Sequence, residues 1–317
     1  MNFFTSLLNS MPGAAAQGLI WGVMAIGVYL TYKILDIADL TVDGSICTGG
    51  AVCVMLTLNG CPVWLAMLAA LVAGLLAGLV TGVLNTLFGI PAILAGILTQ
   101  LALYSVNLRI MGWGTRNGSQ SNLPISVDKY DLVVSSRYVR DLSLENPLVV
   151  LVILVPVLIG VLYWFFGTEL GASLRATGAN GNMARAQGIN TDFAKVLGLM
   201  ISNGLVAFSG ALLAQYSGFA DINMGRGAIV IGLAAVIIGE VIFDKIFHNF
   251  ALKLLASVIG AIVYYVVIQF VLRLGLSTDD LKLLTAVVVA LFLAIPYWKG
   301  KYFAKPVAVK KEAEKHA

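Results

Sequence analysis

The sequence predicts an all-α polytopic membrane protein with about nine transmembrane helices. Of its 317 residues, 59% are hydrophobic and only 11% are charged, and the mean hydropathy of +0.93 is too high for a soluble globular protein. Apolar runs of about twenty residues, the length that an α-helix needs to cross a bilayer, recur along almost the whole chain. The net charge of +4 does not indicate nucleic-acid binding in so apolar a chain.

The apolar runs define the expected elements. Transmembrane helices are predicted over residues 14–35, 45–58, 62–84, 91–111, 148–166, 195–217, 228–243, 252–273 and 281–298. All of them belong to one transmembrane domain. Its parts are a first half over about 14–111, a loop over 112–146, a linking helix over 148–166, a loop over 168–194, a second half over about 195–298 and a tail over 299–317.

The basic residues indicate the orientation of the chain. Six of the twenty Lys and Arg residues lie in the tail over 299–317, and Lys-rich segments stay in the cytoplasm. Alternation counted back from the tail places the loop 168–194 in the cytoplasm, and it places the loop 112–146 and the N-terminus outside. The outer loop holds four basic and four acidic residues, so its own charge neither supports nor opposes this orientation.

Two of the predicted helices, 45–58 and 228–243, are short for a hydrocarbon layer of about 30 Å. A polar, glycine-containing segment precedes each of them, and an offset of 182 residues matches the two segments, Asp39 falling on Asp221. The same offset carries the first predicted helix onto the sixth. Because the two copies enter the membrane from opposite sides, we expect an inverted repeat, in which broken helices at matching positions mark a transport pathway.

Polar residues at the two breaks are candidates for contact with a transported solute. A carboxylate at membrane depth costs about 2.5–3.5 kcal/mol even on the lenient insertion scale, so it needs a reason to be there. These groups can offer acceptors to an ammonium or a hydroxyl-bearing solute, or they can cap helix N-termini, such as that of a helix beginning near Ile46. One residue can do both. The candidates are Asp39, Thr41, Asp43, Ser45, Asp221 and Asn223.

Other polar and aromatic side chains lie inside the predicted helices. Hydrogen bonding between helices is the leading interpretation of the polar ones, with solute contact as the alternative. The polar residues are Gln17, Gln100, Asn107, Asn203, Gln215 and Gln269. The aromatic residues Trp21, Tyr29 and Tyr104 suit packing or interface anchoring better than stacking on a ligand. Near the end of helix 228–243, Glu240 is expected to reach the interface or to pair with Lys245.

The sequence offers no sign of covalent catalysis. Its two histidines, His248 and His316, fall in a predicted inner loop and in the tail. Cys47, Cys53 and Cys61 lie in or beside one apolar helix without a CxxC pair, so we expect them to pack. The sequence contains no GxxxxGK[ST] loop for ATP. A transporter of this kind would use an ion gradient or a separate ATPase subunit.

A polar stretch over residues 171–192 lies between two long apolar helices. Its small residues suit a short helix on the cytoplasmic surface, and Arg175 and Arg185 can make charge-assisted bonds to another protein. The alternative is a solvated loop whose basic residues only set the topology. A docking helix beside an apolar pathway favours a pump whose motor is another protein.

These segments resemble the membrane-spanning permeases of bacterial ABC importers, in the group that includes branched-chain amino acid, ribose and nucleoside systems. The resemblance covers nearly the whole chain. Its most specific parts are ADLTVDGS over residues 38–45 and the block GxxLRATGxNxxxARxxGIN from Gly171 to Asn190. The first is most similar to permeases that accompany lipoprotein-type receptors for aromatic amino acids and related solutes.

The resemblance implies a docking role for the inner loop, which in this family forms a coupling helix in a cleft of the ATPase. ATP and Mg²⁺ are then bound by the partner, and no cofactor or metal is expected in this chain. Carried over to this sequence, the role falls on Leu174, Arg175, Ala176, Thr177, Gly178, Asn180, Ala184, Arg185 and Gly188.

The other implied partners are a second permease copy, identical or related, an extracytoplasmic solute-binding protein, a small-molecule solute and the lipid of the bacterial cytoplasmic (inner) membrane. The implied function is import of a small polar solute, an amino acid first, by alternating access. The alternatives are a nucleoside or sugar permease, an ion-coupled secondary transporter and a structural membrane protein. Some family members carry an additional N-terminal helix, whereas residues 1–13 are too short to span the membrane here.

Overall fold

The computed structural model describes residues 3–115, 118–127, 129–139, 146–243, 246–247, 249–273, 283, 285–287, 289–292 and 294. The elements of the first half are α1 (Phe3–Tyr29), the π-helix η1 (Leu30–Ile34), α2 (Val42–Leu58), α3 (Val63–Thr86) and α4 (Ala92–Met111). Those that follow are β1 (Asn122–Pro124), the 3₁₀ helix η2 (Ser136–Tyr138), α5 (Pro147–Phe166), α6 (Glu169–Ala179), α7 (Gly181–Ala186), α8 (Thr191–Ser217), β2 (Phe219–Asp221), α9 (Ala228–Phe243) and α10 (Phe250–Arg273).

The predicted all-α membrane fold is confirmed. Among the described residues, six helices are long and apolar enough to cross a membrane, and α2 and α9 are shorter apolar helices. Half of the predicted helix 281–298 lies outside the described residues, as do Lys245, His248 and the tail, so the total of about nine stays a prediction. Residues 3–13 extend the first helix, which begins at Phe3 and not at residue 14.

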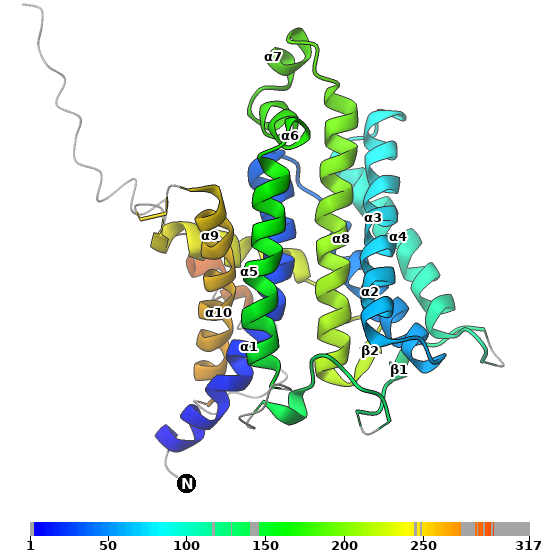
Figure 1. The fold of residues 1–317 in the computed structure, drawn as a ribbon, viewed down its shortest axis with the longest axis vertical. Coiled ribbons are helices and arrows are strands. Elements are labelled where there is room, and N and C mark those ends of the chain that lie inside the picture. Colours follow the sequence, from blue (N-terminus) through cyan, green and yellow to red (C-terminus); the bar gives the residue numbers. More distant parts are fainter. Residues whose placement is uncertain are drawn as a thin grey trace, which may run out of the picture.

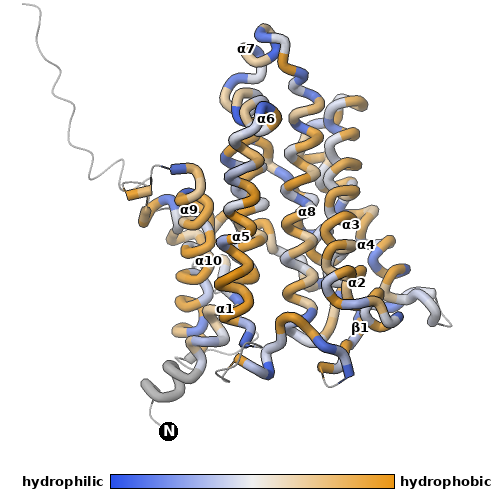
Figure 2. The backbone as a smooth tube through the Cα atoms, in the orientation of Figure 1, coloured by the Kyte–Doolittle hydropathy of each residue, from blue (hydrophilic) through white to orange (hydrophobic). Residues whose placement is uncertain are grey.

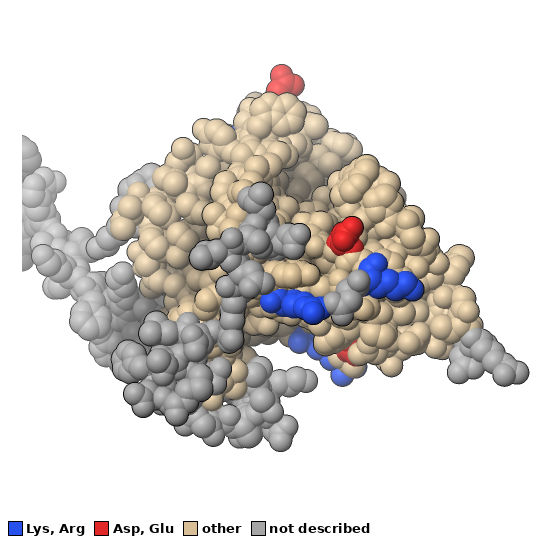
Figure 3. Space-filling view, turned by 60° about the horizontal axis from the view of Figure 1, so that its bottom comes forward, with Lys and Arg blue, Asp and Glu red and all other residues tan. Residues whose placement is uncertain are grey.

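The long helices α1, α5 and α8 run along the long axis of the molecule (Figure 1). Helices α6 and α7 lie at one end, and β1, β2 and the N-terminus lie at the other. Figure 2 shows hydrophobic residues along the helices between these ends, with hydrophilic residues gathered around α6 and α7 and in the opposite loops. On the end that carries β1 and β2, the visible surface has a few charged side chains of both signs (Figure 3).

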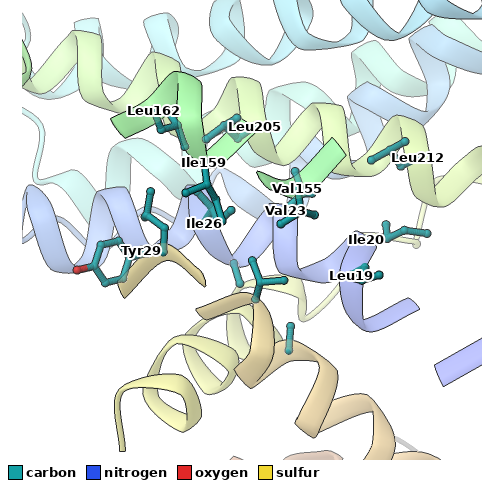
Figure 4. Close-up of a cluster of buried hydrophobic side chains, with 14 of the residues drawn as sticks. Leu19, Ile20, Val23, Ile26, Tyr29, Val155, Ile159, Leu162, Leu205 and Leu212 are labelled. Atoms are coloured by element: carbon teal, nitrogen blue, oxygen red, sulfur yellow. The ribbon is translucent and has the colours of Figure 1, made fainter. Parts of the chain in front are cut away.

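Helices α1 and α8 form the centre of the packing. Helix α8 packs on α1, α2 and α3, and α1 packs on α8, α9 and α10. Side chains of α1, α5 and α8 meet in a buried apolar cluster, including Ile26, Ile159 and Leu205 (Figure 4). Two hydroxyl groups of α8 bond backbone carbonyls of α1: Ser202 donates to Gly27, and Ser209 donates to Ile20, each over 2.7 Å.

Small residues allow α3 to approach α8 closely. A Cβ atom on Gly74 would collide with the backbone of Asn203, and one on Gly78 would collide with that of Leu199. The spacing of four residues puts these glycines on one face of α3, which permits backbone contact between helices. The opposite face of α3 leaves large apolar side chains exposed, among them Leu65 and Leu76.

A short antiparallel sheet connects the loop before α5 to the segment between α8 and α9. Asn122 pairs with Asp221, Leu123 with Ala220, and Pro124 with Phe219. The sheet therefore holds Asp221, where the chain turns back toward α9, against the loop over 112–146.

Candidate functional site

The first break in the helices lies between η1 and α2, over residues 35–41. The chain leaves η1 through Asp36, whose φ of 55° is positive, as is common where a helix ends. Helix α2 begins at Val42 and not near Ile46, so Asp43 and Ser45 lie inside its first turns. Neither caps α2 as the sequence had suggested, because both side chains bond other parts of the molecule.

The carboxylate of Asp39 is buried and fully engaged. Its Oδ1 accepts a bond from the backbone N–H of Thr41 over 2.9 Å, and its Oδ2 accepts one from Nδ2 of Asn203 over 2.6 Å. Asn203 in turn accepts from the hydroxyl of Ser45 over 2.6 Å. Since Asp39 is only 2% exposed and Ser45 and Asn203 are fully buried, this network ties the first break to α8.

The hydroxyl of Thr41 extends the network toward α3 and α4. Its Oγ1 lies 2.7 Å from Oγ1 of Thr81, which donates to Oγ1 of Thr99 over 3.0 Å. All three threonines are buried. In this conformation, three of the predicted pathway residues, Asp39, Thr41 and Ser45, therefore contact protein atoms inside the bundle.

The second break lies between β2 and α9, over residues 222–227. Asp221 accepts from the backbone N–H of Asn223 over 2.7 Å and from Nδ2 of Asn122 over 3.4 Å. Asn223 is exposed. The chain then passes so close to α2 that a Cβ atom on Gly225 would collide with the backbone of Asp43.

The two breaks meet at Asp43. Its two carboxylate oxygens accept bonds of 3.0 Å from the backbone N–H groups of Gly227 and Ile229, at the beginning of α9. A carboxylate stabilises a helix N-terminus by bonding free N–H groups and by opposing the helix dipole. Asp43 is therefore a cap, as one interpretation of the sequence held, but it caps the short helix of the other half.

A pocket lies beside this meeting point, with about 520 Å³ of space including its open side. It is bounded by α2, by α4 and by the second break, and its polar lining comes from Asp43, Cys47, Gln100, Tyr104, Asn107 and Arg226. Of the six predicted pathway residues, Asp43 alone lines it, whereas Asp221 and Asn223 flank the lining residue Ile222.

Four polar residues that line the pocket are not among the leading candidates for solute contact that the sequence predicted. Gln100, Tyr104 and Asn107 follow the i, i+4, i+7 spacing of one helix face, which could have grouped them from sequence alone. Arg226 stands in the polar segment before α9, where only the acidic and amide groups had been considered.

The polar stretch over 171–192 forms the two short helices α6 and α7. Gly171, Leu174 and Thr177 form the buried face of α6, and a Cβ atom on Gly178 would collide with the carbonyl of Ile34 in η1. The predicted docking segment, made of α6 and α7, is therefore attached to the helix that leads into the first break.

The remaining residues of the predicted docking set lie mostly on the surface. Ala184 is buried, Ala176 is half-buried, and Arg175, Asn180, Arg185 and Gly188 are exposed. Both arginines already have partners in this chain. Arg175 donates to the carbonyl of Phe166 over 2.9 Å, and Arg185 donates to the hydroxyl of Thr191 over 2.8 Å and lies 3.6 Å from the carboxylate of Asp192.

Among the described residues, no group of three or more His, Cys, Asp or Glu side chains is arranged to hold a metal ion. Cys47 and Cys53 are buried and free, and Cys61 is partly buried and free. The polar lining of the pocket offers groups for hydrogen bonding and charge recognition.

Known proteins are similar in sequence to this chain over most of its length. A family model described as branched-chain amino acid transport system / permease component matches residues 10–296. The chain is 42% identical over 287 residues to a tyrosine transport system permease protein of Clostridioides difficile (strain R20291), over 90% of this chain and 91% of that protein. No solved structure matches the chain.

Two further relatives extend the comparison. An uncharacterized protein of Rickettsia prowazekii (strain Madrid E) is 35% identical over 90% of this chain and 98% of its own length. An autoinducer 2 import system permease protein of Yersinia pestis (strain Pestoides F) is 30% identical over 76% of this chain and 64% of its own length. The resemblance found in the sequence is confirmed: this multi-pass membrane protein belongs to the family of branched-chain amino acid transport system permease components.

Proposed function

We propose that this chain is the permease subunit of an ABC importer that moves an amino acid across the bacterial cytoplasmic membrane. The observation that carries the proposal is the meeting of two broken helices beside a pocket with opposite charges, since discontinuous helices supply binding groups at membrane depth. The relative from Clostridioides difficile, named a tyrosine transport system permease, supports an amino acid over a sugar or a nucleoside.

An inverted repeat underlies the proposed pathway. Under the offset of 182 residues, Ile20 corresponds to Ser202, and Gly27 corresponds to Ser209. The contact between residues 202 and 27 is therefore the counterpart of the contact between residues 20 and 209, as expected for two contacts related by a pseudo-two-fold axis, although α8 supplies the donor in both. Likewise, Asp43 touches its own counterpart, Gly225.

The packing of whole helices supports the same relation. Helix α1 packs on α9 and α10 of the second half, and α8 packs on α2 and α3 of the first half. The first helix of each half, α1 or α8, is thus packed against the second and third helices of the other half. Rocking one half against the other would change access to the pocket at their junction.

The driving force in this proposal comes from a separate ATPase that binds ATP and Mg²⁺ and docks on α6 and α7. Movement of α6 would reach the first break directly, because Gly178 lies against Ile34. Differential contact of the ATPase with two states of the permease is what shifts their populations. A second permease copy and an extracytoplasmic solute-binding protein complete the assembly.

Purification of the tagged chain from native membranes tests the proposal, with mass spectrometry of the proteins that accompany it. We expect an ATP-binding subunit, and ATP-driven uptake of L-tyrosine or L-phenylalanine once the complex and its solute-binding protein are placed in vesicles. A chain that purifies alone and accumulates solute under an ion gradient would instead be a secondary transporter.

Cysteine labelling tests the proposed orientation. Ser119, in the loop before α5, and Asn182, in α7, are both exposed and lie at opposite ends of the molecule. In cells whose native cysteines have been replaced, a membrane-impermeant maleimide should label Ser119→Cys from outside, and it should label Asn182→Cys only after lysis. The reverse pattern would place the N-terminus and α6 on the other sides of the membrane.

A further inference from the structure

The pocket between α2, α4 and the second break contains two opposite charges that do not pair with each other. Asp43 and Arg226 both line it, yet among the described residues neither side chain forms an ion pair within 4 Å. The carboxylate of Asp43 is held by backbone N–H groups at the beginning of α9. Arg226 is exposed. The space between them suits a ligand that carries both a cation and an anion.

An unpaired acceptor lines the same pocket. Asn107 is 1% exposed, and its Nδ2 donates to the carbonyl of Gly44 over 3.4 Å, but its Oδ1 has no hydrogen-bond partner among the described residues. A buried acceptor without a partner is unfavourable, so nearly all such groups in folded proteins find a donor. Because that oxygen is inaccessible in this conformation, the amide of Asn107 has to turn toward the pocket before a ligand N–H group beside Asp43 supplies that donor.

The open side of the pocket is apolar and aromatic. Tyr104 is 43% exposed and Leu101 is 64% exposed, and both line the pocket one helical turn apart on α4. Aromatic rings favour offset or edge contacts with other rings, and they bury a large apolar area. This wall suits the side chain of an apolar or aromatic ligand.

We infer that the pocket is a binding subsite for a zwitterionic α-amino acid with an apolar or aromatic side chain. The ammonium group bonds Asp43 and Oδ1 of Asn107, the carboxylate bonds Arg226, and the side chain lies against Tyr104 and Leu101. The inference rests on the proposed function, and it adds the chemical class of the solute and the groups that recognise it. A sugar would leave both charges unmatched.

Protection of an engineered cysteine tests the subsite in the purified complex of the permease with its ATPase. Leu101→Cys is introduced after Cys47, Cys53 and Cys61 have been replaced by Ser, Ala and Ser. The matched control is Val106→Cys, which is 46% exposed on the same helix and does not line the pocket. The probe is L-phenylalanine at millimolar concentration, and the readout is the rate of maleimide labelling.

We expect L-phenylalanine to slow labelling at residue 101 and to leave the rate at residue 106 unchanged. Arg226→Gln should raise the half-protecting concentration about tenfold or more, because a charge-assisted bond to the carboxylate is lost. Arg109→Gln, which removes an exposed arginine from α4 outside the pocket, should not change it. Phenethylamine, which lacks the carboxylate, should protect equally in wild type and in Arg226→Gln.

The outcomes separate the subsite from the proposed function, since ATP-driven uptake of L-phenylalanine is measured with the same complex. Uptake without protection at residue 101, or protection that Arg226→Gln leaves unchanged, would overturn the subsite. Equal protection at residues 101 and 106 would also overturn it, because that result reports a general conformational change. Selective protection without uptake would support the subsite and contradict the proposed function.

Discussion

Each of the two breaks precedes a short apolar helix, α2 or α9, but the two breaks differ in character. The first, over 35–41, buries Asp39 and Thr41 and gives both of them partners inside the bundle. The second, over 222–227, leaves Asn223 and Arg226 exposed. One break therefore connects helices to each other, and the other presents polar groups to a pocket.

The cost of leaving buried polar groups unpaired explains this difference. Opening the first break would strand a carboxylate and several hydroxyl groups, each costing about 1–3 kcal/mol or more when unpaired. The second break bonds to the rest of the molecule mainly through its backbone, at the beginning of α9. We expect the first break to act as a fixed brace and the second to adapt to a solute.

The largest effect in this comparison is expected from the amide that holds the first break. Asn203→Leu keeps the branched shape of the side chain but removes the bonds to Asp39 and Ser45, and it should lower the free energy of unfolding by about 3 kcal/mol or more. The matched change Asn223→Leu, at an exposed position, should stay within about 0.5 kcal/mol. Thermal unfolding of both variants in detergent measures the difference, and equal losses would remove the distinction between the two breaks.

An intermediate effect is expected where the docking segment contacts the start of the first break. Gly178→Val drives a side chain into the backbone of Ile34. The matched control is Gly160→Val in α5, outside α6 and α7, where a Cβ atom would meet no atom within 4 Å. The first variant should shift α6 and reduce ATP-driven uptake about tenfold or more, while membrane assembly is retained. The second should transport as wild type does. Normal transport by Gly178→Val would show that the contact with η1 does not transmit the movement of α6.

Hydropathy and residue pattern predicted much of this arrangement. The short helices α2 and α9 lie where the apolar runs are shortest, and the polar segments before them carry the acidic residues that the structure buries or uses as caps. The partners could not be predicted, because they are distant in sequence. Asp39 and Asn203 are 164 residues apart, and Asp43 and Gly227 are 184 apart.

The pocket could not be predicted from sequence either, because its walls come from segments that are distant in sequence. Gln100, Tyr104 and Asn107 share a helix face that sequence spacing reveals, but the spacing cannot tell whether this face meets lipid, another helix or a cavity. In the structure this face lines a cavity, because Arg226 of the second half lies on the other side of the same pocket. A polar pattern on one helix thus becomes a candidate site only when the fold places a second charged segment beside it.

The smallest effect is expected from the ion pair between the helices that flank the two breaks. Nζ of Lys33 in η1 lies 2.7 Å from the carboxylate of Glu240 in α9, and the side chains are 45% and 40% exposed. Glu240 therefore pairs with a residue of the first half, and Lys245, its predicted partner, lies outside the described residues. Water and salt screen such a pair, so Glu240→Gln should change the free energy of unfolding by less than about 1 kcal/mol.

A double-mutant cycle with Lys33→Gln isolates the coupling between the two side chains. The coupling should shrink as ionic strength rises, because the pair is partly exposed. A coupling as large as the loss in Asn203→Leu would mean that the two halves are held together at this end of η1 rather than by the buried amide. The first break would then no longer be the main brace, and movement of α6 would have to break the ion pair before it reached the pocket.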